Sequence, residues 1–308
     1  ADRTLKPWKR ALLYTAFGFF ALIASFFITF PYDALKDRVK NEADAAGYFV
    51  RIGSMGPGLF SVRATELQLS KKADPSAETP PEALRIDSLS VGPSLFPPGV
   101  SVTAKLLEGS VKARVSGLSA VGVHVSLDEL DLSKGNMKGF SGIDFSGRIG
   151  GEIDLKVPRA SVGGQAPEPD FGAATGTISL DTKALSINGG TVSLVLPMYG
   201  AEPTPLDLPK IAVGDLEAKL SFDKGAGKID ELHTKSSDLE IQASGTLKLA
   251  KRLEYSEPNI EVRIKTEPEF VKRLGLIGSA LSMIGPDPKD PNFRMGRLTG
   301  YLGRPNFR

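Results

Sequence analysis

Two histidines, His124 and His233, are the side chains of this 308-residue chain best suited to acid–base or metal chemistry near neutral pH. They lie far apart in the sequence, each within a segment whose polar and apolar residues alternate. The chain has no cysteine, and it lacks the H-E-x-x-H, G-x-S-x-G and G-x-G-x-x-G patterns of metal, nucleophile and dinucleotide sites. We therefore interpret both histidines as structural and expect no enzyme activity, no metal and no cofactor.

Two further patterns could bind phosphate or calcium. Residues 225–228 read Gly-Ala-Gly-Lys, but a phosphate loop needs the longer G-x-x-x-x-G-K-[ST] pattern, and Ile229 stands where Ser or Thr should. The acidic residues at 128–131 do not alternate toward a closing Glu as a calcium loop requires. We interpret the first pattern as a turn between strands and the second as a solvated strand edge.

The segments that would position these side chains alternate with a period of two, which is typical of strands with one dry and one wet face. The clearest runs are residues 143–157 and 239–249, and shorter ones occur at 84–91, 100–106, 121–127, 191–196, 216–222 and 260–264. We predict that the apolar residues of the two clearest runs line either a groove or a core. These candidates are Ile143, Phe145, Ile149, Ile153, Leu155, Leu239, Ile241, Leu247 and Leu249.

The number of strands and the composition indicate a mainly β fold. The chain has 33 glycines and 22 prolines and little helix between its strands, which favours antiparallel meander pairing over parallel pairing with crossover helices. Short amphipathic helices are expected at 33–46 and at 269–284. The sequence therefore predicts a large, curved, mostly antiparallel sheet with one or two short amphipathic helices. Its apolar face forms either an open groove or the filled core of an elongated β-sandwich, since both need one apolar face.

Residues 11–30 contain no charge and would span roughly 30 Å as a helix, which is the thickness of a bilayer core. Trp8, Lys9 and Arg10 before this run and Tyr32 after it are residue types that favour membrane interfaces. A cleaved signal peptide and a buried core helix are the alternatives. The run is longer than a signal-peptide core and lacks both a small-residue cleavage site and a polar stripe. We therefore predict a single-pass transmembrane anchor.

The charges around this run predict its orientation. Residues 1–30 hold four of the chain's 38 basic residues and one of its 36 acidic residues, so the N-terminus is expected in the cytoplasm. The rest of the chain is then near neutral, which argues against nucleic acid as a partner. The predicted layout is a cytoplasmic N-terminus (1–10), an anchor (11–30), a membrane-proximal helix (31–47) and an exported β-domain (48–308). The absence of cysteine fits an oxidising compartment.

Several segments resemble two related families of bacterial envelope proteins. The runs FPYDALKDRV (30–39), AGYFVRI (46–52) and LFSVRATELQL (59–69) are similar to the opening of the bitopic type II secretion system protein N family and of the AsmA-like group. Residues 229–249, which end SGTLKL, resemble the repeating strands of the AsmA-like group. The run GRLTGYLGRP (296–305) resembles the end of protein N relatives.

The resemblance to protein N implies a non-catalytic accessory of a type II secretion system, anchored in the inner membrane with its bulk in the periplasm. Its partners would be the periplasmic parts of secretion-platform or secretin proteins. The resemblance to the AsmA-like group implies a different role, in which an apolar β-groove binds or conducts lipid. Both roles involve binding rather than catalysis.

Overall fold

The computed structural model describes residues 14, 17–18, 25, 29–58, 61–72, 83–117, 120–138, 142–161, 167–195, 203–282 and 284–307. Within them, 16 strands form one antiparallel sheet. Fourteen strands follow one another across this sheet nearly in sequence order, while β8 and β10 pair beside β7 and β9. The predicted mainly β, antiparallel meander is confirmed.

The first half of the sheet contains the following strands: β1 (Tyr48–Gly58), β2 (Ser61–Lys71), β3 (Leu84–Leu95), β4 (Pro98–Leu106), β5 (Gly109–Ser116), β6 (Ala120–Asp131), β7 (Ile143–Ala160) and β8 (Glu168–Pro169). The second half contains β9 (Thr175–Val195), β10 (Pro203–Leu208), β11 (Ile211–Asp223), β12 (Ala226–Lys235), β13 (Leu239–Lys248), β14 (Glu257–Thr266), β15 (Arg294–Tyr301) and β16 (Arg304–Phe307). Most connections are short turns, which keeps consecutive strands adjacent.

Few helices accompany the sheet in the described residues. The helix expected at 33–46 is present as α2 (Tyr32–Ala45), which contacts β1. The single helix expected at 269–284 is wrong in detail, because α4 (Pro268–Arg273) and α5 (Leu276–Ser282) are separate. Gly275 lies between them with φ +56°, a left-handed conformation that ends the first helix. Short 3-10 turns are η1 (Leu132–Lys134), η2 (Phe171–Ala173) and η3 (Leu253–Tyr255).

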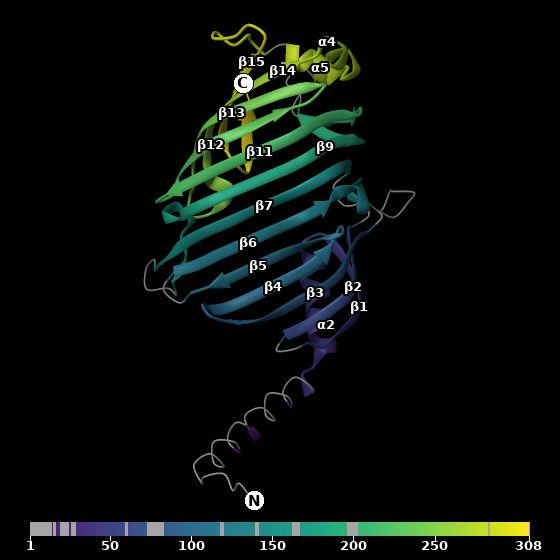
Figure 1. Cartoon of the computed structure of the whole chain (residues 1–308), viewed down its shortest axis with the longest axis vertical. Helices are drawn as coiled ribbons and strands as arrows, with labels where there is room; N and C mark the ends of the chain where they lie inside the picture. The colour runs from purple at the N-terminus through teal and green to yellow at the C-terminus, as the bar shows by residue number, and fades with distance from the viewer. Residues whose placement is uncertain are drawn as a thin grey trace, which may run out of the picture.

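The sheet is strongly curved, and both of its ends turn away from the viewer in Figure 1. Irregularities in pairing cross the central strands where residues adopt left-handed conformations: Glu129 in β6, Gly147 in β7, Ala184 in β9 and Gly214 in β11. Such bulges bend a strand and increase its twist. The row of bulges therefore gives the sheet its curvature.

Among the described residues, no helix is long and apolar enough to cross a membrane. Of the predicted anchor at 11–30, the structure describes only residues 14, 17–18, 25 and 29–30, and Trp8, Lys9 and Arg10 lie outside the described residues. Tyr32, the fourth predicted interface residue, opens α2, and its ring centroid lies 5.2 Å from that of Phe30. The anchor stays a prediction.

Candidate functional site

The strand register collects apolar side chains into a row that crosses the sheet from β1 to β15. Each member is the register partner of the next. The row consists of Pro57, Val62, Val91, Val102, Ala113, Val125, Ile153, Ile178, Leu220, Ile229, Gly245, Ile260 and Leu298. No residue in this row has a polar side chain. We refer to it as the central apolar row.

The rows on either side of the central apolar row are also apolar; they lie two residues along each strand, or three where the register shifts in β12. One consists of Pro93, Val100, Val115, Val123, Leu155, Gly176, Phe222, Gly227, Leu247 and Pro258. The other consists of Ala64, Leu89, Ala104, Val111, Leu127, Gly151, Leu180, Ala218 and Leu232. Because alternate residues of a strand share a face, the three rows make one continuous apolar surface.

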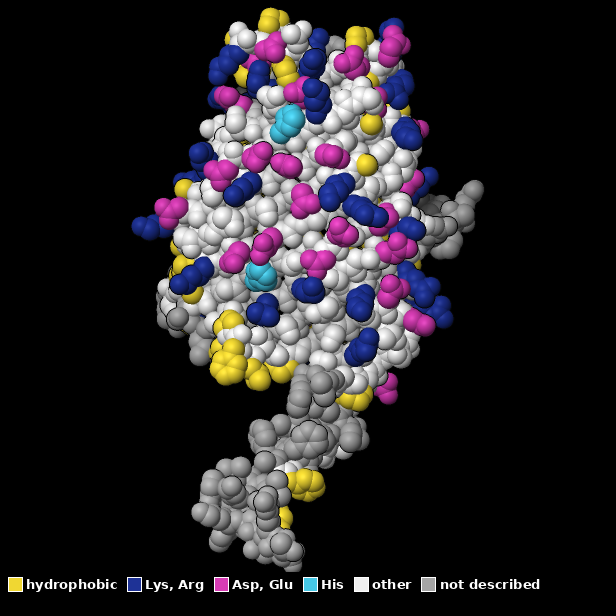
Figure 2. Space-filling view, in the orientation of Figure 1, with side chains coloured by type: hydrophobic (Ala, Val, Ile, Leu, Met, Phe, Trp, Pro, Cys, Tyr) yellow, Lys and Arg dark blue, Asp and Glu magenta, His cyan; other side chains and the backbone are white. Residues whose placement is uncertain are grey.

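The opposite face of the sheet is polar. One of its rows consists of Ser101, Arg114, His124, Asp154, Thr177, Ser221, Lys228, Thr246 and Asn259. Figure 2 shows this face, with acidic and basic side chains interspersed over the whole sheet. The sheet ends curl away from this side, so the polar face is convex and the apolar face is concave.

Both histidines lie on the convex face, on strands β6 and β12, and well apart in Figure 2. His124 Nδ1 lies 3.7 Å from carboxylate oxygens of Glu152 and of Asp154, and His233 Nε2 lies 3.6 Å from Glu240. The fold does not bring the two histidines together. Nor do the described residues contain a group of three or more His, Cys, Asp or Glu side chains that could hold a metal ion.

The concave face is only partly covered. Near its centre Val125, Ile153, Ile178 and Leu220 are half-buried, whereas a packed second layer would bury such residues fully. Toward one rim the exposure rises, and Val91, Val100 and Val115 are 37%, 49% and 47% exposed. Within the row, Ile229 on β12 is buried, and Ile178 and Leu220 pack against a cluster of buried residues. The central apolar row is therefore covered at β12 and only partly covered elsewhere.

Full burial occurs in four separate clusters on this face. Val157 and Phe222 belong to a cluster over β6 to β13, and Leu84 and Leu130 to one over β3 to β9. A third covers β1 to β3, and α4 and α5 pack on Ile211 in the fourth. None of these clusters of described residues joins β1–β5 to β12–β16. The two ends of the curved sheet thus do not close on each other through a shared core.

All nine predicted lining residues lie on the concave face, in or just after β7 and β13. Leu155, Leu247 and Leu249 share one cluster, Phe145 and Ile149 share another, and Leu239 lies beneath α4 and α5. Ile143 faces Gly190, Ile153 faces Ile178 and Ile241 faces Ile264 across neighbouring strands. The structure unites them as one surface but not as one contact group, because β9, β11 and β12 lie between β7 and β13.

Sequence reasoning missed the most exposed part of this surface, on β3 to β5. The signal was present, since Val111, Ala113 and Val115 alternate with polar residues in β5. It also missed a cavity of about 500 Å³ between α2 and β1, which is lined by Lys36, Lys40, Asn41, Asp44, Tyr48, Phe49, Val50, Arg51 and Ile52. The cavity depends on how α2 packs against β1, which no pattern within either segment reveals.

A buried ion pair fastens the segment before β15 to the sheet. Asp287, 2% exposed, accepts hydrogen bonds from Arg263 Nε and from the backbone N–H of Lys289 at 2.8 Å. The Lys289 bond, followed by the Arg263 guanidinium, lowers the pKa of Asp287 despite its burial. Arg263 also donates to Gln242 at 2.9 Å and lies 4.7 Å from the centroid of the Phe293 ring. Both carboxylate oxygens of Asp287 and two guanidinium nitrogens of Arg263 thus have hydrogen-bond partners within the protein.

Comparison with known proteins found no matching family model, no matching curated protein and no matching solved structure.

Proposed function

We propose that the protein binds the acyl chains of lipids along its concave face and serves as a passage for them. The observation that carries this proposal is the central apolar row, which is unbroken by any polar side chain and half-buried over its middle strands. Soluble proteins rarely expose a continuous apolar surface of more than a few hundred Å² without a ligand or partner for it. An apolar occupant would remove this surface from water at a gain of about 25 cal/mol per Å².

The chemistry of the rows favours hydrocarbon over other ligands. A peptide or a polar metabolite would bring hydrogen-bonding groups to a surface that has no side-chain donor or acceptor for them, at a cost of about 1–3 kcal/mol each. A methylene chain needs no such partner. Neighbouring strands are spaced about 4.8 Å apart, so the path along the central apolar row from β1 to β15 is about 60 Å long. This path is longer than one acyl chain, which suits a passage rather than a single pocket.

The proposed setting is the cell envelope. If residues 11–30 form the predicted anchor, α2 and β1 lie closest to the membrane along the chain, and the concave face begins there. A lipid leaving that membrane would meet the β1 end of the apolar surface first. The AsmA-like resemblance of the sequence supports the same role.

A site-specific photo-crosslinking experiment tests this proposal. A photoreactive amino acid replaces Ile153 on the concave face in one variant of the full chain and its neighbour Asp154 on the convex face in another. After irradiation in cells grown with labelled phosphate, we expect labelled lipid on the Ile153 variant only. Equal labelling at both positions, or none at either, would overturn the proposal.

A second candidate is the protein-binding accessory role in a type II secretion system, which the edge of the sheet favours. β1 has 11 residues and pairs with β2 but with no other described strand. Long sheet edges can accept an added strand from a partner protein. Photoreactive residues along β1 would then crosslink to a secretion-platform protein, whereas Ile153 would capture no lipid.

A further inference from the structure

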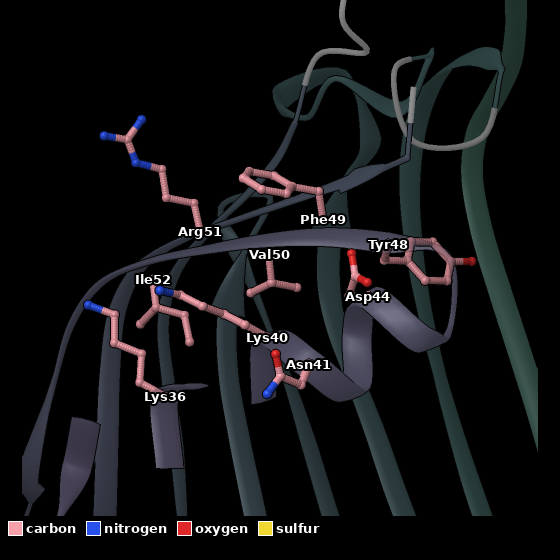
Figure 3. Close-up of a pocket in the computed structure, with 9 residues that line it drawn as sticks. All are labelled: Lys36, Lys40, Asn41, Asp44, Tyr48, Phe49, Val50, Arg51 and Ile52. Atoms are coloured by element: carbon pink, nitrogen blue, oxygen red, sulfur yellow. The ribbon is translucent and has the colours of Figure 1, made fainter. Parts of the chain in front are cut away.

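The cavity between α2 and β1 combines an apolar floor with a cationic side. Val50 and Ile52 point from β1 toward α2, whereas Phe49 and Arg51 point away from the helix (Figure 3). Lys36 and Lys40 lie one helical turn apart and extend in the same direction, with the end of Lys40 beside Ile52 (Figure 3). The cavity therefore presents two ammonium groups next to aliphatic side chains.

The positive charge of this cavity is not neutralised by its own acidic residue. Asp44 is engaged by Lys72, whose Nζ lies 2.8 Å from the carboxylate. The ion pair of Lys40 with Asp37 is long, 4.0 Å, and that carboxylate is largely exposed. Lys36 forms no ion pair with any residue that the structure describes. An anion in the cavity would thus contact the ammonium groups of two lysines with little competition from the protein's own carboxylates.

The apolar floor of the cavity is continuous with the concave face. Ile52 is the register partner of Leu67, and both are buried in the cluster over β1 to β3. The half-buried Met55, Ile86 and Leu89 pack against this cluster and lead from the cavity onto the concave face. A molecule with its charged end at the two lysines could therefore lay its apolar part directly on the sheet.

We propose that this cavity receives the phosphate of an anionic lipid headgroup, with the acyl chains on the concave face. This inference rests on the proposed function and adds a ligand class and a point of entry. Lysine ammonium groups bind phosphate as point charges. The single carboxylate of the cavity is already paired, so the ammonium group of a zwitterionic lipid has no partner there and is repelled by Lys36 and Lys40. A volume of about 500 Å³ suits a headgroup.

The test compares two lysine pairs in the full chain carrying the photoreactive residue at position 153. One variant combines Lys36→Gln with Lys40→Gln. The matched control combines Lys156→Gln with Lys219→Gln, which removes the same charge from exposed positions on the convex face. Each protein is irradiated with vesicles of phosphatidylcholine alone or mixed in equal parts with phosphatidylglycerol. Circular dichroism verifies folding.

We expect the unsubstituted lysines and the control to favour phosphatidylglycerol, and the Lys36→Gln/Lys40→Gln variant to lose about 2- to 30-fold of that preference, as two partly exposed ion pairs imply. Crosslinking with the preference intact in this variant overturns the headgroup site but leaves the proposed function standing. No crosslinking with either vesicle overturns the proposed function itself. Inorganic phosphate that binds the two lysines without lipid, and does not compete with phosphatidylglycerol, also overturns the headgroup assignment.

Discussion

An asparagine placed in the central apolar row distinguishes an open concave face from a filled core. Ile153 on β7 and Ile178 on β9 are register partners and half-buried. Fully burying an isoleucine stabilises a fold by about 1.5–3 kcal/mol. Both side chains are buried over most of their surface, so losing that burial costs about 1–2.5 kcal/mol at each site. In an open face, water reaches the new amide and adds no further penalty.

The same substitution in a dry core costs more. Val157 is 1% exposed and lies in the cluster with Phe222 and Leu249. There an asparagine loses the whole burial term and adds about 1–3 kcal/mol for an unsatisfied amide, which gives a loss of about 2.5–6 kcal/mol. Val157→Asn is therefore the matched control for Ile153→Asn and Ile178→Asn.

Urea unfolding of the delipidated full chain, followed by circular dichroism, measures these differences. We expect the free energy of unfolding to fall about 2- to 3-fold less for Ile153→Asn than for Val157→Asn. Ile178→Asn should lie between them, because Ile178 packs against the cluster that contains Val157. Losses of equal size at all three positions would contradict an open concave face, because they would mean that this face is closed.

Three further predictions concern the parts of the sheet that hold its shape. Asp287→Ala leaves Arg263 without its buried partner, so we expect a lower unfolding midpoint and faster hydrogen exchange in residues 285–293; unchanged exchange would contradict this. Lys112, Ser110 and Ser126 hold the pKa of Asp128 down to about 2, below its unfolded value. The stabilisation is thus complete above the unfolded pKa and is lost as the pH falls toward 2. Asp128→Asn should lower stability at pH 7 but not at pH 2, and a pH-independent difference in urea midpoints would contradict the assignment. Gly176 has φ +140°, and a Cβ there would lie 2.0 Å from the Asp154 carbonyl oxygen. Thermal unfolding should therefore show that Gly176→Ala lowers stability by at least about 1–3 kcal/mol. Gly56→Ala is the control, because the space around Gly56 is open.

The sequence was sufficient to predict the strands, because alternation of apolar and polar residues reports directly which face of a strand is dry. Residues 143–157 and 239–249 showed this most clearly, and both lie within or just beyond the strands β7 and β13. The antiparallel meander followed from the shortage of helix between strands. The nine predicted lining residues share the concave face for the same reason.

The positions of the bulges that bend the sheet, and the openness of its concave face, could not be predicted. Glu129 and Ala184 adopt left-handed conformations in the bulges, although neither residue type favours that conformation. The sequence pattern of an apolar face is the same whether that face is covered or open to solvent. Only the partial exposure of Val100 and Val115 in the structure distinguishes a covered face from an open one. The cationic cavity depends on the packing of α2 on β1, which brings Lys36 and Lys40 beside Ile52.

A photo-crosslinking scan along the central apolar row is the most direct test of the proposal that lipid binds the concave face. Single photoreactive residues at Val102, Val125, Ile178 and Ile260 sample the row from β4 to β14, and Thr103, Ser126, Ser179 and Glu261 next to them sample the convex face. We expect labelled lipid at every concave position and at none of the convex ones. Lipid at no concave position, or equally on both faces, would contradict the proposal.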